Sequence, residues 1–311
     1  MKVFVTGATG ALGSATVPLL RASGHDVRGV ARDEPKADRL RHAGADPVIV
    51  DLFDPEAILA ATAGCDAIAH LATNVPPLER AARRTAWSTH DRLRSEATRY
   101  LLAAAATHGI TTFVKESIVY VYPDRGDEWI DETVPPDTSL ELLAATRDGE
   151  HQVGVFTEEG GRGVVLRFGL FYGSTSRTVD EALRLARLRG SILAGAPGAY
   201  ESSIHTDDAA AAVVAALAVP GGTYNVADDE PLTRREYLAA FSHAFGLPRL
   251  HATPGWLLRA VGGPSARALL ASQRVANSRF RAATGWAPAY PSVREGWAAV
   301  AAARAAGTGV R

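Results

Sequence analysis

Thr6-Gly7-Ala8-Thr9-Gly10-Ala11-Leu12-Gly13 is the stretch that decides the fold of this 311-residue chain. It follows an apolar run at residues 3–5 and precedes a helical pattern at residues 14–22. A strand, a tight glycine turn and a helix N-terminus in this order form a cradle for a dinucleotide. The alternative is a glycine-rich turn of another α/β protein, but a second strand at residues 26–31 follows where a dinucleotide fold needs one.

Each glycine of this loop has its own physical task. We expect Gly7 to adopt the backbone angles of the sharp turn, and Gly10 to leave room for the pyrophosphate. Gly13 lets the helix lie close to the strand. The free N–H groups and partial positive charge of the helix N-terminus then face the phosphates.

The end of the second strand indicates which dinucleotide binds. An acidic residue there would accept hydrogen bonds from the ribose 2′-hydroxyl, whereas Ala31 and Arg32 remove the acid and supply a fork suited to a 2′-phosphate. Lys36 is a second candidate cation. In the alternative interpretation, Arg32 is a solvated charge and Asp33 binds the ribose. We favour NADPH/NADP over NADH.

Composition excludes several classes of protein. A formal net charge of −1 gives no global field that would recruit nucleic acid or an anionic membrane. The single cysteine, Cys65, excludes an internal disulfide framework and is expected in the core. The apolar stretch at residues 209–219 is too short to span a bilayer, and residues 1–13 read as a strand and phosphate loop rather than a signal peptide. We therefore expect a soluble, cytoplasmic protein without a metal site.

Strand and helix patterns alternate through the first half of the chain, as in βαβ units. This alternation predicts an α/β fold with a doubly wound parallel sheet, the Rossmann architecture. The expected strands are residues 2–5, 26–31, 47–50, 67–71, 112–114 extending toward 120, and 163–168. The expected helices are residues 14–22, 35–43, 55–61, 90–108 and 142–157.

The second half is less regular and predicts a smaller C-terminal substrate lobe. We expect a dinucleotide-binding domain at residues 1–170 and a mainly substrate-binding lobe at 171–311, with residues 205–226 returning to the first domain. Helices are expected at residues 208–218, at residues 234–245, and as a final surface helix at 297–306.

Several short motifs in the right order resemble the extended short-chain dehydrogenase/reductase superfamily over nearly the whole chain. Besides the glycine loop, they are Asp51-Leu52, His70-Leu71-Ala72, Arg167-Phe168-Gly169-Leu170-Phe171-Tyr172-Gly173, His205-Thr206-Asp207-Asp208 and Tyr224-Asn225-Val226.

The resemblance implies a cofactor site along these motifs. Asp51 and Leu52 would flank the adenine, and residues 168–170 would approach the nicotinamide, although the family more often has proline at Phe168. His70 and His205 are expected to be structural, with His205 and Asp208 fixing a turn and a helix start. The full set of expected cofactor residues is Gly7, Thr9, Gly10, Ala11, Leu12, Gly13, Arg32, Lys36, Asp51, Leu52, Leu71, Ala72, Thr73, Phe168, Gly169 and Leu170.

The family's catalytic triad is missing from this sequence. In the family a serine or threonine, a tyrosine and a lysine act together, the tyrosine giving a proton to the alkoxide formed by hydride transfer. Matching Val121-Tyr122 to the family's Ser-x-x-Val-Tyr pattern places Ile118 at the serine position, one residue after Ser117. Matching Glu150 to the family's helix glutamate places Leu142 and Thr146 at the tyrosine and lysine positions.

Three hydroxyl groups remain as candidate catalytic residues. Ser117 and Tyr120 lie near the C-terminal end of the fifth strand, the edge where open α/β sheets bind ligands. Ser95, on the helix after the fourth strand, is the third. We expect an NADPH-dependent ketoreductase acting on an aromatic ketone of a polyketide, angucyclinone-like, whose own phenol donates the hydrogen bond to the alkoxide.

Two alternatives stay open. The chain could be a catalytically silent protein that senses NADP(H), with aromatic side chains of the second half lining a small-molecule pocket. It could also resemble a sugar-nucleotide epimerase or dehydratase, although such enzymes need the tyrosine base even more than a reductase does. The stereochemistry and the oligomeric state do not follow from the sequence. The aromatic pocket candidates are Tyr200, Tyr224, Phe241 and Trp256.

Overall fold

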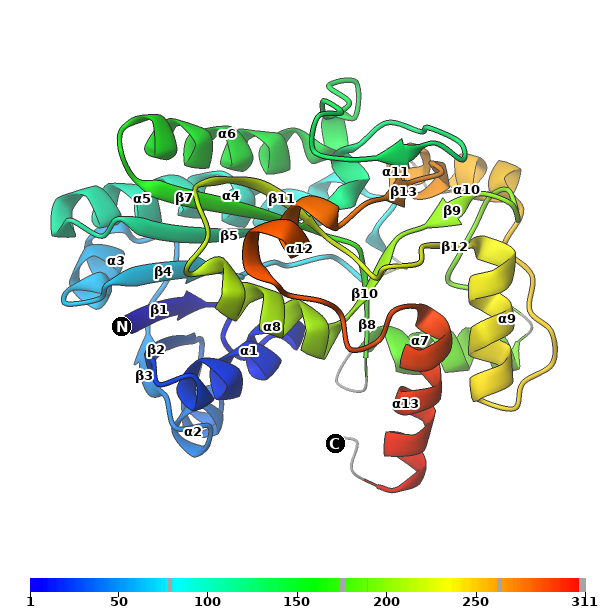
Figure 1. Cartoon of the computed structure of the whole chain (residues 1–311), viewed down its shortest axis with the longest axis horizontal. Helices are drawn as coiled ribbons and strands as arrows, with labels where there is room; N and C mark the ends of the chain where they lie inside the picture. The colour runs from blue at the N-terminus through cyan, green and yellow to red at the C-terminus, as the bar shows by residue number, and fades with distance from the viewer. Residues whose placement is uncertain (78–79, 174–176, 189, 262–264, 308–311) are drawn as a thin grey trace.

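The computed structural model describes residues 1–77, 80–173, 177–188, 190–261 and 265–307. Within these residues, seven parallel strands form one twisted sheet in the order β11-β7-β5-β4-β1-β2-β3 (Figure 1). The order reverses between β1 and β4, which is the switch point where doubly wound sheets bind dinucleotides. The predicted fold class is therefore confirmed. The strands are β1 (Lys2–Thr6), β2 (Asp26–Ala31), β3 (Asp46–Ile49), β4 (Ala67–His70), β5 (Thr112–Ile118), β7 (Arg162–Phe168) and β11 (Gly222–Val226).

Helices cover both faces of the sheet and enclose two apolar layers. The central strands are buried on both sides because parallel strands joined by helices have no solvated face. One face carries α1 (Ala11–Ala22), α2 (Glu34–His42) and α8 (Thr206–Ala216). The other carries α3 (Pro55–Thr62), α4 (Ser88–Arg94), α5 (Glu96–His108) and α6 (Ala144–Glu158).

The predicted helix at residues 90–108 is in fact two helices. The chain breaks at Ser95, whose ψ of −64° and φ of −110° depart from helical geometry between α4 and α5. The periodicity continues across the break, so the sequence pattern did not reveal it. The break directs the last turn of α4 toward β5 and α6, where Arg94 becomes buried.

The C-terminal lobe lies beyond the C-terminal ends of the sheet strands (Figure 1). Short strands connect it to the sheet domain: β8 (Leu170–Tyr172) pairs with β10 (Ser203–His205), β9 (Tyr200–Glu201) with β12 (Leu232–Thr233), and β6 (Trp129–Ile130) with β13 (Arg274–Val275). The remaining helices are α7 (Arg177–Arg187), α9 (Arg234–Ala244), α10 (Gly255–Val261), α11 (Ser265–Leu270), α12 (Ser278–Thr284) and α13 (Val293–Ala305).

The last helix exposes one face, as expected for a surface helix, but its inner face is buried in the lobe. Trp297 of α13 is fully buried and contacts the rings of Tyr172, Tyr237 and Phe241. The helix therefore forms part of the core of the lobe.

Candidate active site

The glycine loop has the geometry that a dinucleotide requires. Gly7 adopts a φ of +67°, and a Cβ there would lie 2.6 Å from the carbonyl oxygen of Leu71. A Cβ on Gly13 would lie 2.2 Å from the carbonyl oxygen of Gly7. Backbone therefore occupies the space that side chains would need, and the expected tasks of Gly7 and Gly13 are confirmed.

The N-terminus of α1 is left free for an anion. Gly10 is the N-cap residue, no side chain caps it, and the first turn contains no acidic residue. The N–H groups of this turn thus have no side-chain partner to satisfy them. A pyrophosphate fits this cradle, which residues 7–13 would hold through backbone N–H groups.

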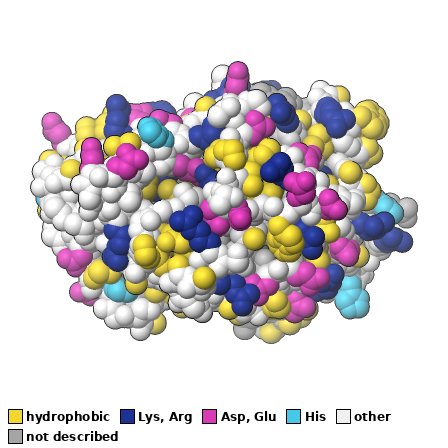
Figure 2. Space-filling view, turned by 45° about the horizontal axis from the view of Figure 1, so that its top comes forward, with side chains coloured by type: hydrophobic (Ala, Val, Ile, Leu, Met, Phe, Trp, Pro, Cys, Tyr) yellow, Lys and Arg dark blue, Asp and Glu magenta, His cyan; other side chains and the backbone are white. Residues whose placement is uncertain are grey.

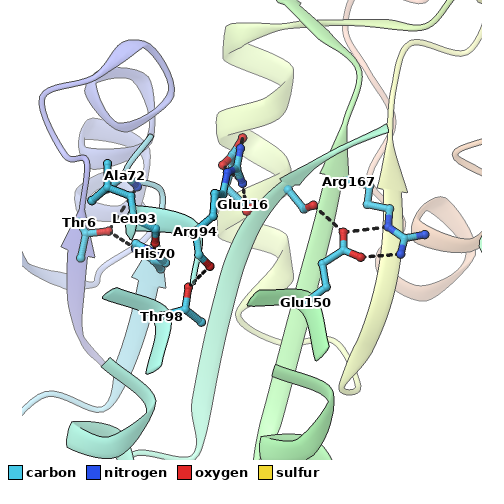
Figure 3. Close-up of polar contacts among 10 residues, drawn as sticks. Thr6, His70, Ala72, Leu93, Arg94, Thr98, Glu116, Glu150 and Arg167 are labelled. Carbon is cyan, nitrogen blue, oxygen red and sulfur yellow. Dashed lines mark hydrogen bonds and ion pairs between the residues drawn. The ribbon is translucent and has the colours of Figure 1, made fainter. Parts of the chain in front are cut away.

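A chain of hydrogen bonds fixes the loop after β4 beside the glycine loop (Figure 3). The N–H of Ala72 donates to the hydroxyl of Thr6 over 3.3 Å, and that hydroxyl lies 2.7 Å from Nδ1 of His70. Nε2 of His70 donates to the carbonyl of Leu93 over 2.9 Å, which leaves Nδ1 as the acceptor. Burial and the nearby Lys115 hold the pKa of His70 well below its usual value, so the ring is neutral. The structural role expected for His70 is confirmed.

The charges at the end of β2 differ in how they are engaged. Arg32 is exposed and makes no hydrogen bond or ion pair within the described part of the chain. Asp33 caps α2, because its carboxylate accepts the backbone N–H of Lys36 over 2.9 Å. Nζ of Lys36 lies 2.5 Å from Asp33 Oδ2, and these bonds lower the pKa of Asp33. The alternative in which Asp33 binds the ribose thus requires a carboxylate that already has partners.

The remaining cofactor candidates line the edge with backbone more than with side chains. Leu71 and Phe168 are buried in the core, so only their backbone faces the edge. Gly169 lies against the backbone of Ser202, from whose carbonyl oxygen a Cβ would be 2.8 Å away. The oxygen Oδ1 of Asp51 accepts the N–H of Phe53 over 3.0 Å and shapes the turn after β3. Contacts of these residues with the cofactor remain predictions.

Ser117 belongs to a closed cluster of buried polar groups (Figure 3). Its hydroxyl donates to Oε1 of Glu150 on α6 over 2.5 Å. Glu150 also accepts two bonds from Arg167 on β7, from Nε over 3.0 Å and from Nη2 over 2.6 Å. The guanidinium of Arg167 lies 4.8 Å from the ring centre of Tyr122. All of these groups have partners, so Ser117 has the geometry of a structural residue.

The hydroxyl of Tyr120 also donates a hydrogen bond to a buried carboxylate. Its hydroxyl donates to Oε1 of Glu201 over 2.5 Å, and Oε2 of Glu201 lies 3.5 Å from Nε of the buried Arg234. Enclosure of the hydroxyl and the charge of Glu201 raise the pKa of Tyr120 well above its usual value. A general acid needs a pKa near the working pH, so this tyrosine is poorly suited to donate a proton.

Ser95 links two helices at the break between α4 and α5. Its hydroxyl donates to Oδ2 of Asp148 on α6. Gln152 donates to the same carboxylate oxygen over 2.8 Å. The three candidate hydroxyls thus donate to three different carboxylates, Asp148, Glu150 and Glu201.

Buried side chains stand where the family carries its tyrosine and lysine, just before α6 and in its first turn. Leu142 and Thr146 are only 6% and 1% exposed. One turn further along α6, Gly149 leaves space that Lys115 of β5 fills: a Cβ on Gly149 would lie 2.7 Å from Cε and 3.1 Å from Nζ of Lys115. The sequence pattern did not indicate this meeting, because the two residues are brought together by the packing of α6 on β5.

Lys115 carries an unusual charge state for a lysine. It is 1% exposed, and the end of its side chain lies against Gly149 of α6. Burial, together with the positive charge of Arg94, lowers the pKa of Lys115 to about 7. Arg94 itself lies 2.5 Å from Glu116. The carboxylates of Glu116, Glu150 and Asp148 act on Lys115 in the opposite direction and raise its pKa.

His205 and Asp208 join the sheet domain to the C-terminal segment. Nδ1 of His205 accepts the N–H of Asp207 over 3.3 Å and caps α8, which confirms its expected role. The carboxylate of Asp208 accepts the N–H groups of Ala289 and Tyr290 over 2.8 and 3.1 Å instead of capping the helix. Both histidine and aspartate are therefore structural.

A cavity of about 640 Å³ opens beyond the C-terminal edge, between the segment after Tyr120 and the lobe. Its volume is typical of small-molecule sites. Trp256 lines it together with Arg259, whereas Phe241 and Tyr224 are buried in the two cores. Tyr200 packs against Arg274, 4.8 Å from the ring centre. Of the aromatic side chains expected to line a pocket, Trp256 alone lines this cavity in the part of the chain described here.

The surface shows mixed charge. On the face in Figure 2, acidic and basic side chains are interspersed with apolar ones. Among the described residues, no helix has the length and apolar character needed to cross a membrane.

Residues 3–227 match the model of the family described as the NAD dependent epimerase/dehydratase family. The chain belongs to this family. The match agrees with the resemblance to extended short-chain dehydrogenases, and it includes the glycine loop at residues 7–13.

Proteins named as reductases are among the relatives of this chain. A 3-diazoavenalumate denitrifying reductase of Streptomyces sp is 33% identical, over 95% of this chain and 99% of the relative. A 4-hydroxy-2-methyl-3-oxo-4-farnesyl-3,4-dihydroquinoline-1-oxide ketoreductase of Stigmatella aurantiaca is 29% identical, over 79% of this chain and 74% of the relative.

Among solved structures, the human epimerase family protein SDR39U1 with NADPH is similar to this chain. The TM-score is 0.80 with 25% identity, covering 97% of this chain and 99% of that one. The expected cofactor, NADP(H), agrees with this NADPH-bound neighbour.

Proposed function

We propose that this protein is an NADPH-dependent reductase whose substrate needs no proton from the protein. The observation that carries the proposal is that no free acid is found among the candidate residues near β5 and α6. Leu142 and Thr146 stand at the family's acid and lysine positions, and the three nearby hydroxyls donate to Glu150, Glu201 and Asp148.

The groups beside the glycine loop, at the C-terminal edge of the sheet, support the binding of NADPH as the hydride donor. Residues 7–13 would hold the pyrophosphate, and Arg32 is available for the 2′-phosphate. When bound, NADPH supplies a hydride. The 640 Å³ cavity beyond the edge has room for an aromatic substrate next to Trp256.

An aromatic diazonium is the acceptor that best suits this site. The arene gains the hydride with its two electrons in a new C–H bond, the C–N bond breaks, and its electron pair leaves with N₂. The net conversion is ArN₂⁺ + NADPH → ArH + N₂ + NADP⁺, in which no proton is consumed. The relative named as a 3-diazoavenalumate denitrifying reductase supports this acceptor class, since it is similar over nearly its whole length.

A ketone beside a phenol is the second candidate acceptor. Hydride addition to the carbonyl leaves an alkoxide, and the neighbouring phenol of the same molecule protonates it. Aromatic polyketides such as angucyclinones carry this arrangement, and the pattern of missing residues resembles that of an angucyclinone ketoreductase. The Stigmatella ketoreductase supports a ketone on a ring that is fused to an aromatic ring.

The experiment supplies purified protein with NADPH deuterated at C4 of the nicotinamide. One reaction contains an ortho-hydroxy arenediazonium, and a parallel one contains an ortho-hydroxyaryl ketone. We expect stereospecific loss of deuterium from NADPH and its appearance on carbon in the product. Release of N₂ in the first reaction identifies the diazonium as the acceptor.

The alternatives predict other results. A sensor binds NADPH tightly and oxidises it with neither acceptor, and that outcome would overturn the reductase proposal. An epimerase or dehydratase retains bound NAD(H) without net oxidation and acts on a sugar nucleotide. Deuterium in the product excludes both.

A further inference from the structure

Arg234, in the first turn of α9, lies fully buried behind one wall of the 640 Å³ cavity. Its guanidinium binds the end of α11, the helix that supplies Leu270 to that wall. Nη1 donates to the carbonyl of Leu270 over 3.2 Å, and Nη2 donates to the carbonyls of Leu269 and Ala271 over 3.0 and 2.7 Å. The last carbonyls of a helix have no partner within the helix, so this one arginine closes the C-terminal end of α11.

The segment at residues 195–199 also lines the cavity and is built against the same arginine. The backbone N–H of Arg234 donates to the carbonyl of Ala199 over 2.8 Å. A Cβ on Gly195 would lie 2.4 Å from Nη1 of Arg234, so the guanidinium occupies the space that a side chain would need. Gly255 of α10 packs on this glycine in turn, since a Cβ on Gly255 would lie 3.4 Å from the Cα of Gly195. Three stretches of the cavity wall are thus arranged around one side chain.

Arg234 also connects the cavity wall to the end of β5. Its Nε lies 3.5 Å from Oε2 of Glu201, and Oε1 of Glu201 accepts the hydroxyl of Tyr120 over 2.5 Å. The ring of Tyr120, which follows β5, packs against a small apolar cluster that includes Ala268 of α11. A buried ion pair is stable only when its geometry is fixed and its other polar atoms are hydrogen-bonded. The carbonyls of α11 and the hydroxyl of Tyr120 supply those hydrogen bonds.

We infer that Arg234 is a positioning residue for the substrate. It holds the end of α11 and the segment at residues 195–199 in the arrangement that accepts an aromatic ring beside Trp256. The inference rests on the proposed function, which places the substrate in this cavity. Because Arg234 is fully buried, it acts through the wall and not by touching the substrate. A wall remote from the reacting atoms contributes equally to the ground state and the transition state, so its loss raises KM and leaves kcat unchanged.

The test compares Arg234→Lys with the matched control Arg235→Lys, where the neighbouring side chain is exposed. Lysine keeps the charge beside Glu201, but its ammonium does not reproduce the planar fork that reaches three carbonyls. A second variant combines Arg234→Met with Glu201→Gln, so that neither charge is left buried alone. The probe is 1-acetyl-2-naphthol, a planar ketone with a neighbouring phenol. Calorimetric titration gives its Kd for the NADP⁺ complex, and steady-state kinetics with NADPH give kcat and KM.

We expect both Arg234 variants to raise the Kd and KM of the probe about tenfold or more and to leave kcat within about threefold, because charged hydrogen bonds to α11 are lost. The Kd of NADP⁺ should change less than about twofold, since its cradle at residues 7–13 is remote from this wall. Arg235→Lys should leave every value unchanged.

Three results would overturn the inference. The first is normal probe affinity in the folded Arg234 variants. The second is an equal rise in the Kd of the probe and of NADP⁺, which indicates general damage to the fold. The third is failure of both Arg234 variants to fold, as judged by melting curves, which would give Arg234 a role in the fold and not in the cavity.

The outcome is separable from that of the proposed function. Protein that binds the probe, and binds it more weakly in Arg234→Lys, but reduces neither a ketone nor a diazonium would refute the reductase proposal and leave this inference standing. Turnover with unchanged Kd and KM in Arg234→Lys would do the reverse. If the unmodified protein did not bind the probe, the cavity would not accept an aromatic ring, and the inference would be wrong.

Discussion

Polar groups are unpaired at one half of the sheet's C-terminal edge and paired with one another at the other half. At the half built from β1 and β2, the N–H groups of the first turn of α1 and the guanidinium group of Arg32 have no side-chain partner within the described residues. At the half built from β5 and β7, the hydroxyl of Ser117 and the charges of Glu150 and Arg167 satisfy one another.

This contrast distinguishes groups that are available to bind a ligand from groups that stabilise the fold. A free cation or N–H group at an edge is inexpensive while solvated and gains a partner when an anion binds. A buried carboxylate without its arginine is costly, so the cluster at the second half stays closed. The first half thus presents groups that suit an anion, and the second holds groups that pair with one another.

The largest effect is expected at the glycine cradle. Gly13→Val should reduce dinucleotide affinity at least about a hundredfold, because its side chain would meet the carbonyl of Gly7 and push α1 off the loop. Calorimetric titration with NADP⁺ measures it. Gly154→Ala is the control, since a Cβ there meets nothing within 4 Å and affinity should not change. Normal NADP⁺ affinity in Gly13→Val would show that the cradle does not bind the pyrophosphate.

The next effect concerns the closed cluster. Arg167→Met should lower the free energy of unfolding by about 3–5 kcal/mol, because Glu150 is left buried without its partner. Urea unfolding at neutral pH measures the change. Arg21→Met, which breaks an exposed pair with Asp26, should cost less than about 1 kcal/mol. If both variants lose the same small amount, the cluster is not the structural element described here.

A smaller effect should appear in the pH dependence of stability. The pKa of Lys115 is about 7 in the folded protein and near its ordinary value in the unfolded chain. Between about pH 7 and pH 10, the unfolded chain binds a proton that the folded protein has released, so this group makes stability rise with pH.

Lys115→Met should therefore flatten the curve of unfolding free energy across that interval and stabilise the protein most near neutral and acidic pH. Urea unfolding at a series of pH values compares the two proteins. Parallel curves would mean that Lys115 keeps its ordinary pKa and is solvated when charged.

The smallest effect on turnover is expected at Tyr120. Tyr120→Phe should leave the rate of reduction within about fivefold of the unmodified protein, far from the 10²–10⁴ that an essential acid supplies. The variant should lose about 1–3 kcal/mol of stability instead, because Glu201 loses a buried donor. Steady-state rates with a phenolic ketone, alongside urea unfolding, distinguish the two effects. A loss of about a thousandfold in turnover, with stability unchanged, would make Tyr120 the proton donor.

Sequence reasoning recovered the features that depend on residues near one another in the chain. The glycine loop and the capping role of His205 follow from local backbone requirements, since a positive φ at Gly7 or a helix start at residue 206 is encoded by a few adjacent residues. The absence of the family's tyrosine and lysine was equally visible, because it is a statement about residue identity alone.

Only the tertiary structure decided which polar groups are free and which are paired. The cluster of Ser117, Glu150 and Arg167 is built from two strands and a helix. The spacing of these positions in the sequence does not indicate that the side chains are in contact. The same holds for Lys115 against Gly149 and for Trp297 in the core of the lobe. Sequence patterns encode local conformation, whereas these contacts depend on strand register and helix packing between segments far apart in the chain, and packing is what sets burial, charge state and the availability of a proton.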